Sequence, residues 1–145
     1  MLKKYIFLLA LCICFIFSSA SAQEKQVTIM LNGQELTSDV APQLINSRTM
    51  LPMRAIFEAL GADVTWLGED QIIIATRGET MISLKIGQPV MSIQKISSDK
   101  NNVIELDVAP YLHNSRTMVP VRAVAEALDA KVEWIDATWT VVITQ

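Results

Sequence analysis

Apolar residues recur with helical spacing in two short stretches of the chain, at positions i, i+3, i+4 and i+7. The two sets are Met53, Ile56, Phe57 and Leu60, and Val121, Val124, Ala125 and Leu128. Pro52 precedes the first set and suits a first helical position, because its missing N–H costs nothing there. Gly61 follows that set where helices commonly end in a left-handed residue, and Asp129 holds the equivalent place in the second. The pattern predicts two short helices, each with one buried face.

Period-two alternation and turn residues predict strands around both helices. Asn32-Gly33 is a favoured two-residue hairpin turn, and it joins predicted strands at 27–31 and 34–36. We expect a hairpin after each helix, and a connecting hairpin and a single strand between the two helical stretches. These predicted strands span 64–66 and 71–75, 132–134 and 138–143, 80–86 and 90–96, and 103–106.

A match of the chain to itself at an offset of 68 residues organises the sequence. Between 39 and 66, 19 of 28 positions are identical to those 68 residues later. The longest shared run is Asn46 to Met50, which recurs as Asn114 to Met118. We therefore expect an α+β fold with two β-hairpin/helix/β-hairpin units, at about 27–76 and 90–144, in which an antiparallel sheet packs on two helices.

The first 22 residues have the layout of a signal peptide. Lys3 and Lys4 precede an apolar run at 5–17, and small residues follow at 18–22. A run of 13 residues is short for a membrane-spanning helix, which needs about 20. We predict cleavage after Ala22, which leaves residues 23–145 as a secreted or cell-envelope associated domain without stable membrane insertion. An uncleaved membrane anchor is the alternative.

The composition of the exported part limits its partners. Removal of residues 1–22 leaves ten Lys or Arg against 15 Asp or Glu, a net charge of about −5, and no cysteine. An acidic balance without a basic run argues against nucleic acid or an anionic membrane as a partner. Without disulfides, the domain depends on its apolar core for stability. A homo-oligomer is left open, because sheet edges in such a fold are unpaired.

The repeated residues resemble those of a known family. The doubled motif Asn-Ser-Arg-Thr-Met-x-Pro-x-Arg-Ala, the following Glu-Ala-Leu-x-Ala-x-Val-x-Trp segments and the hairpin at 31–35 are similar to copper amine oxidase N-terminal domain-like proteins, also called stalk domains. The resemblance covers nearly all of residues 27 to 144. It implies a twisted antiparallel sheet packed on helices and an accessory module in exported proteins.

The resemblance does not imply copper, because in the oxidases the metal and the quinone lie in a separate catalytic domain. After cleavage the chain keeps a single histidine, His113, and copper(II) sites generally use several imidazoles. His113 aligns with Ile45, so we interpret it as an ordinary loop histidine. We expect no cofactor, no metal ligand and no catalytic residue.

Four arginines hold matching places in the two copies: Arg48, Arg54, Arg116 and Arg122. They could form an anion site, but a structural role is favoured. Arg54 and Arg122 each precede a glutamate by four residues on one helix face. We expect Arg48 and Arg116 to tie their turns to carbonyls or to a nearby carboxylate.

The three tryptophans and a carboxylate pair define the remaining hypotheses. Trp66 and Trp134 hold equivalent strand positions and are expected to pack in the core, whereas Trp139 aligns with Gln71 and is the residue we expect to make any exposed contact. The favoured function is a non-catalytic accessory or binding module of the bacterial cell envelope, with an unidentified protein or cell-wall partner. The alternatives are a carbohydrate-binding protein using exposed tryptophan and a small hydrolase with a carboxylate pair such as Glu69-Asp70.

Overall fold

The computed structural model describes residues 25–98 and 100–145. The predicted signal peptide, 1–22, and its cleavage site lie outside these residues. Within them the chain forms 13 strands in three sheets, here called A, B and C, and two helices. None of the helices in this part of the chain is long and apolar enough to cross a membrane.

Sheet C is a five-stranded antiparallel meander in chain order. Its strands are β5 (Asp63–Leu67), β6 (Ile72–Arg77), β7 (Thr80–Lys85), β8 (Val90–Lys95) and β9 (Asn101–Glu105). Alternate side chains of β6 and β7 are buried, as expected when one face of a sheet covers a core. Gly78 and Gly87 have φ angles of 55° and 75°, which a residue with a side chain rarely adopts, and they turn the chain between β6, β7 and β8.

Sheet B joins the two copies of the repeated motif. Its order is β10 (Tyr111–His113), β11 (Arg116–Pro120), β4 (Arg48–Pro52) and β3 (Gln43–Ile45), with all neighbours antiparallel. At the centre β4 pairs with β11, and Leu51 lies opposite Val119, its counterpart 68 residues later. Both side chains are fully buried. The pairing therefore places the two copies around an approximate twofold axis at this residue pair.

Sheet A brings the two ends of the described chain together. It contains β12 (Lys131–Ile135), β13 (Thr140–Thr144), β1 (Thr28–Leu31) and β2 (Gln34–Glu35) in that order. β1 pairs with β13 in parallel, whereas the other pairs are antiparallel. Asn32 and Gly33 both have positive φ, as the predicted hairpin turn between β1 and β2 requires.

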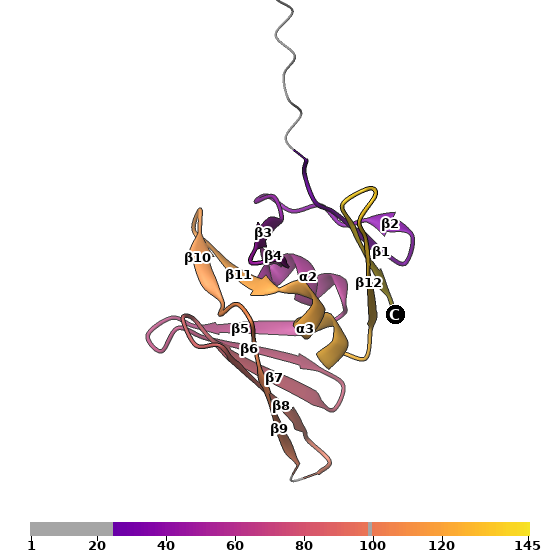
Figure 1. Ribbon diagram of the computed structural model, residues 1–145. Coiled ribbons are helices and arrows are strands. Elements are labelled where there is room, and N and C mark those ends of the chain that lie inside the picture. Colours follow the sequence, from indigo (N-terminus) through magenta and orange to yellow (C-terminus); the bar gives the residue numbers. More distant parts are fainter. Residues whose placement is uncertain (1–24, 99) are drawn as a thin grey trace, which may run out of the picture.

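The helices α2 (Met53–Ala59) and α3 (Val121–Ala127) contact each other in the middle of the molecule, with sheet C below them in Figure 1. The eight apolar positions of the helical pattern are all at most 8% exposed. They share one core with residues of all three sheets, among them Ile29, Leu51, Ile82, Val119 and Ile143. Burial of each large apolar side chain contributes about 1.5–3 kcal/mol.

The α+β prediction, with an antiparallel sheet packed on two helices, is wrong. The described residues are mostly β, in three sheets, and each helix has only seven residues. Strands β3, β4, β10 and β11 occupy segments for which we predicted no strand. β4 and β11 end in three or more consecutive buried residues, so they lack the alternation by which a half-buried strand is recognised. In addition, β1 pairs in parallel.

Two smaller expectations also need correction. Pro52 is the last residue of β4 and the N-cap of α2, so it lies just before the first helical position. Its φ of −52° and ψ of 129° are those of extended backbone. His113 ends strand β10 rather than lying in a loop, and it pairs with Arg116 across the hairpin.

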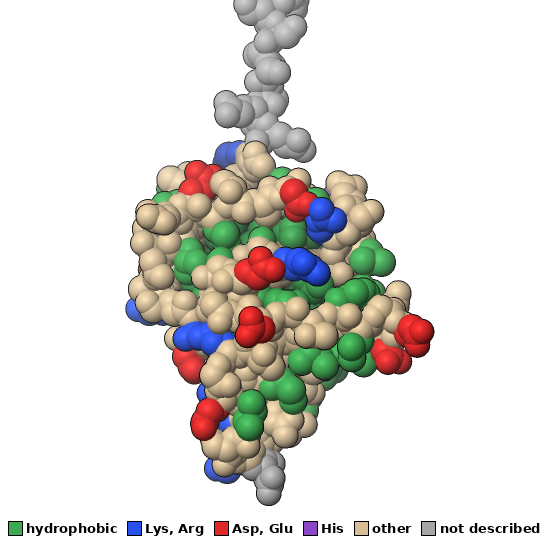
Figure 2. Space-filling model, turned by 180° about the vertical axis from the view of Figure 1, so that it is seen from behind, with side chains coloured by type: hydrophobic (Ala, Val, Ile, Leu, Met, Phe, Trp, Pro, Cys, Tyr) green, Lys and Arg blue, Asp and Glu red, His purple; other side chains and the backbone are tan. Residues whose placement is uncertain are grey.

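Apolar side chains also reach the surface on sheet C. Leu67, Val90 and Val103 are 40%, 40% and 59% exposed. Figure 2 shows hydrophobic side chains over the lower half of the molecule seen from behind, where sheet C lies, with acidic side chains beside them. Sheet C therefore keeps apolar surface that the core does not use.

Candidate functional site

Two grooves lie at equivalent places in the two copies of the motif. The small groove, about 540 Å³, is lined by 38–39, 52–55, Trp66, Leu112 and 115–117. The large groove, about 770 Å³, contains the counterpart of every one of these residues 68 positions away, namely 106–107, 120–123, Trp134, Leu44 and 47–49. Both grooves thus share one set of equivalent lining residues, here called the frame, and most of these residues belong to the repeated motif.

The repeated Asn-Ser pairs form the turns that position this frame. Asn46 and Ser47 have φ angles of 47° and 61°, and Asn114 and Ser115 have 46° and 59°. Two consecutive positive φ values are those of the type I′ turn, whose twist matches that of the flanking strands. The turns hold the hairpins β3–β4 and β10–β11 and place an arginine directly after each of them.

These arginines connect each copy to the other. Arg48 Nε donates to Asp107 Oδ2 at 2.6 Å, and Arg116 Nε donates to Asp39 Oδ2 at 2.7 Å. Each guanidinium also donates to the carbonyl of the preceding serine, at 3.3 Å and 3.2 Å. The hydrogen bond from Arg116 lowers the pKa of the Asp39 carboxyl below its ordinary value. The arginines therefore bind a carboxylate and a carbonyl, as the sequence led us to expect.

The helix arginines behave differently in the two copies. Arg122 Nη1 lies 3.6 Å from Glu126 Oε1 and donates to the carbonyl of Val132 at 3.2 Å. Among the described residues no ion pair forms between Arg54 and Glu58, so the predicted pairing is present in the second copy alone.

The large groove exceeds the small one in volume because further elements line it. β8 and β9 of sheet C contribute Ile93, Lys95, Asn102, Ile104 and Glu105, and the segment from β12 to β13 contributes Trp139 and its neighbours. Within the part of the chain that the structure describes, the small groove is lined by the shared residues alone. The large groove is therefore bounded by α3, by one face of sheet C and by the β12–β13 hairpin.

Trp139 lies in this groove, where it is half-buried. Its ring packs edge-on against Trp134, with centroids 6.2 Å apart and planes at 61°. The Lys25 ammonium lies 5.1 Å from the centroid of the Trp139 ring. The Trp139 carbonyl accepts a hydrogen bond from the Thr28 N–H at 3.0 Å. Its φ is 52°, an unusual conformation for a bulky residue. Trp139 is thus held by neighbours on several sides, with part of its surface on the groove.

The large groove is acidic. Its lining contains three basic residues, Arg48, Lys95 and Arg122, and six acidic ones, Glu105, Asp107, Glu126, Asp129, Glu133 and Asp136. Each of the three basic residues forms an ion pair with one of the acidic residues of the same lining. The small groove instead has two arginines and one aspartate. The net charges of the two linings are therefore opposite in sign.

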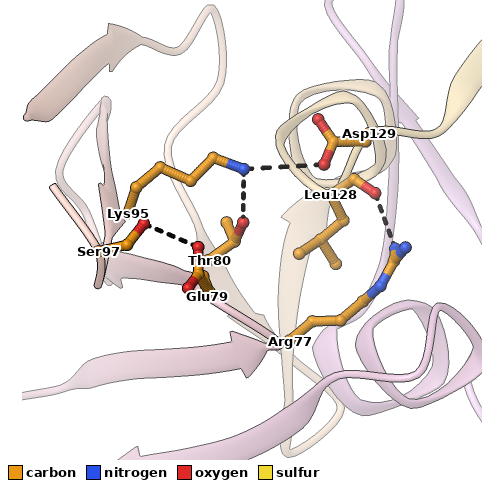
Figure 3. A network of polar contacts seen from close by, with 7 residues as sticks. All are labelled: Arg77, Glu79, Thr80, Lys95, Ser97, Leu128 and Asp129. Carbon is orange, nitrogen blue, oxygen red and sulfur yellow. Dashed lines mark hydrogen bonds and ion pairs between the residues drawn. The ribbon is translucent and has the colours of Figure 1, made fainter.

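A polar network fixes one end of the large groove (Figure 3). Arg77 on β6 donates to the carbonyl of Leu128, the C-cap of α3, at 2.7 Å. Lys95 Nζ donates to Thr80 Oγ1 at 2.8 Å and lies 3.8 Å from Asp129 Oδ2. Cationic side chains near a helix C-terminus satisfy its free carbonyls. These contacts attach α3 to sheet C across the groove.

The remaining candidates do not assemble a catalytic or metal site. Glu69 and Asp70 are exposed in the β5–β6 turn, outside both grooves. Among residues 25–98 and 100–145 no group of three or more His, Cys, Asp or Glu is placed to hold a metal ion. Trp66 and Trp134, expected in the core, pack against it while half-buried and lining the grooves.

Sequence reasoning did not find the grooves. Leu44 and Leu112 line the grooves from edge strands and are 41% and 56% exposed, yet neither lies in the longest repeated run. The sequence does contain one signal for the grooves. Arg48, Asp107 and their counterparts recur at the 68-residue offset although they belong to neither helical face, so the repetition indicates another role for them.

Comparisons with known proteins agree with the resemblance seen in the sequence. The family model for the copper amine oxidase N-terminal domain matches residues 30–143. A relative from Brevibacillus choshinensis, described as a protease inhibitor, is 28% identical over 127 residues, which cover 88% of this chain and 37% of the relative. The chain thus spans well under half of that relative's length. No solved structure matches the chain. The match over residues 30–143 shows that the chain belongs to the copper amine oxidase N-terminal domain family.

Proposed function

We propose that this protein is a secreted, non-catalytic binding module of the bacterial cell envelope that holds a partner protein in its large groove. The observation that carries this proposal is the difference between the two grooves. Both share one frame, but only the large one is extended by a face of sheet C and by the Trp134–Trp139 pair. Pockets that combine apolar walls with a few polar groups are the usual places for ligands.

A protein ligand fits this groove better than a sugar. Sugar rings stack on exposed, flat aromatic faces, whereas Trp139 meets Trp134 edge-on and has Lys25 over its ring. The name of the Brevibacillus relative, a protease inhibitor, also favours a protein as the ligand. The Glu69-Asp70 pair lies in neither groove, which gives the hydrolase alternative no substrate site.

Leu44 and Leu112 provide a matched pair of variants to test this proposal. They occupy equivalent positions on β3 and β10 and are both exposed, but Leu44 lines the large groove and Leu112 the small one. Because both side chains already contact water, Leu44→Asp and Leu112→Asp should fold normally, which circular dichroism checks.

The exported protein and both variants are immobilised and exposed in parallel to the organism's secreted proteins and to purified peptidoglycan. We expect the wild type and Leu112→Asp to retain a secreted protein in stoichiometric amount, and Leu44→Asp to lose it. Retention that does not depend on Leu44, or binding to peptidoglycan alone, would refute the proposal.

A further inference from the structure

Among the described residues, strand β9 presents a free backbone edge beside the large groove. It is the last strand of sheet C, and the Leu106 N–H donates to the carbonyl of Pro89 at 2.9 Å. Because residues of an antiparallel pair bond to their partner alternately, Ile104 bonds to β8 while the backbone groups of Val103 and Glu105 point away from it. A further strand could therefore pair with Val103 and Glu105.

Most of the features that usually protect an edge are missing from β9, whose one charged side chain is that of Glu105. Edge strands are commonly blunted by lysine, proline or a bulge, but β9 has the sequence Asn-Asn-Val-Ile-Glu. Val103 is 59% exposed. The edge is thus open to strand addition, one of the common modes of peptide recognition.

A strand added to β9 would share a face with the large groove. Asn102 and Ile104 of β9 line that groove together with Ile93 of β8. Side chains of neighbouring strands in register point to the same face, so alternate side chains of the added strand would lie beside Ile104, on the face that it shares with Ile93. Apolar side chains at those positions would meet apolar neighbours.

The charge of the groove favours a cationic ligand. Its three basic residues are each paired with an acid of the same lining, and Glu133 is paired with Lys131 at 3.4 Å, so Glu105 and Asp136 bring the acidic excess. Glu105 lies on β9 itself, and Asp136 lies in the β12–β13 turn. The side chains of Glu105 and Asp136, here called the acidic rim, attract lysine or arginine and repel acidic residues.

We propose that the large groove binds an extended, basic and apolar segment of a partner protein as an added strand on β9. This inference rests on the proposed function and names the chemistry of its ligand. Main-chain hydrogen bonds to Val103 and Glu105 hold the segment, its alternate apolar side chains enter the groove, and its basic residues reach the acidic rim.

Synthetic peptides test both parts of this inference on the whole exported protein. Three peptides share the core Val-Thr-Val-Thr-Val and differ only in the two residues at each end, which are Lys, Ser or Glu. Two further versions of the Lys peptide carry N-methyl groups, one on its valines and one on its threonines. Binding is measured by calorimetry and by the shifts of backbone amide signals in NMR spectra.

We expect the Lys peptide to bind about tenfold more tightly than the Ser peptide and the Glu peptide to bind least. This preference should shrink as salt rises from about 50 to about 200 mM. The double variant Glu105→Gln, Asp136→Asn should lose the preference. Its control, Glu69→Gln, Asp70→Asn, removes the same charge outside the groove and should keep it.

N-methylation tests the pairing. An added strand bonds through alternate N–H groups, so methylation of one set should abolish binding and methylation of the other should be tolerated. The Val103 and Glu105 amide signals should shift, and those of edge strand β5 should not. Equal binding of the Lys and Ser peptides, or equal effects of both methylations, would overturn the inference.

The two proposals fail in different ways. If Leu44→Asp loses the partner protein but no peptide binds, the proposed function stands and the strand-addition inference is wrong. If Leu44→Asp retains the partner protein, the proposed function is wrong, whichever peptides bind.

Discussion

Two residues at equivalent helix ends show how a backbone requirement is met with and without glycine. Gly61 follows the C-cap of α2 with a φ of 75°, and Asp129 follows that of α3 with a φ of 61°. At both ends the next amide, Ala62 or Ala130, donates to a carbonyl five residues earlier, at 2.9 and 3.0 Å. This is the Schellman arrangement, which favours glycine at the left-handed position.

We expect Gly61→Ala to lower the free energy of unfolding by about 1–2 kcal/mol, the cost of a left-handed residue with a side chain. A Cβ at this site meets no atom within 4 Å, so the loss comes from the backbone alone. Asp129→Gly should raise the free energy of unfolding by about 0.5–1 kcal/mol, because the ion pair with Lys95 that it also removes is exposed and 3.8 Å long and contributes little. Urea denaturation measures both changes. Unchanged stability of Gly61→Ala would show that this helix end adjusts freely.

Tyr111 carries a buried hydroxyl without a hydrogen-bond partner among the described residues. Burial raises the pKa of this phenol above its ordinary value of 10.0. An unsatisfied buried hydroxyl costs about 1–3 kcal/mol, so Tyr111→Phe should leave stability unchanged or raise it by an amount in that range.

The pH dependence of Tyr111 has a definite sign. As pH rises, the unfolded chain loses the phenolic proton before the folded chain, so folding stability falls above about pH 10. Tyr111→Phe should be spared this loss, and the stability difference between the two proteins should widen from about pH 9 upward. Urea denaturation at several pH values measures it. A difference that stays constant across this range would contradict the assignment.

At the scale of elements, the sequence pattern predicted those helices, turns and hairpins that form between neighbouring residues. The eight buried helix positions, the Asn32-Gly33 turn and the hairpins after each helix were all found correctly, because each depends on neighbours within a few residues. The strands β4 and β11 were missed although each forms a local hairpin, with β3 and β10, because their continuous apolar runs have no period and their pairing with each other is not local in sequence. The grooves were missed because each of them is lined by residues of both copies, which lie far apart in the sequence.

The helix faces are the main contact between the three sheets. Leu60→Ala and Leu128→Ala should each lower the free energy of unfolding by about 2–5 kcal/mol, and Phe57→Ala by about 3–5 kcal/mol, because all three side chains are at most 1% exposed. Glu69→Ala, in the exposed β5–β6 turn, should change it by less than about 0.5 kcal/mol and serves as the control. Equal stability of the leucine and turn variants in denaturant would contradict this account of the core.

At the scale of the whole molecule, the two copies are joined by more than a linker. β4 pairs with β11 at the centre of sheet B, Arg48 and Arg116 each bind an aspartate of the other copy, and β1 pairs with β13. None of these contacts is local in sequence, so no periodicity could reveal them. These contacts nevertheless explain why the motif residues have the same spacing in both copies. A twofold arrangement places equivalent residues on both sides of the axis.

This interlocking predicts that neither copy folds alone. A fragment 27–76 keeps β1–β2 without β13 and β3–β4 without β11, and a fragment 90–144 loses the same pairings from the other side. Isolated hairpins are marginally stable in water, so far-ultraviolet circular dichroism should show both fragments unfolded. Mixing them should not restore the full strand signal, because β7, the central strand of sheet C, belongs to neither fragment. Residues 23–145 should unfold in one transition, with tryptophan fluorescence and circular dichroism giving the same midpoint, because Trp66 and Trp134 report on different copies. A cooperative transition in either fragment, or two midpoints in the whole protein, would show that each copy has a core of its own and that the shared strands of sheets A and B are secondary to it.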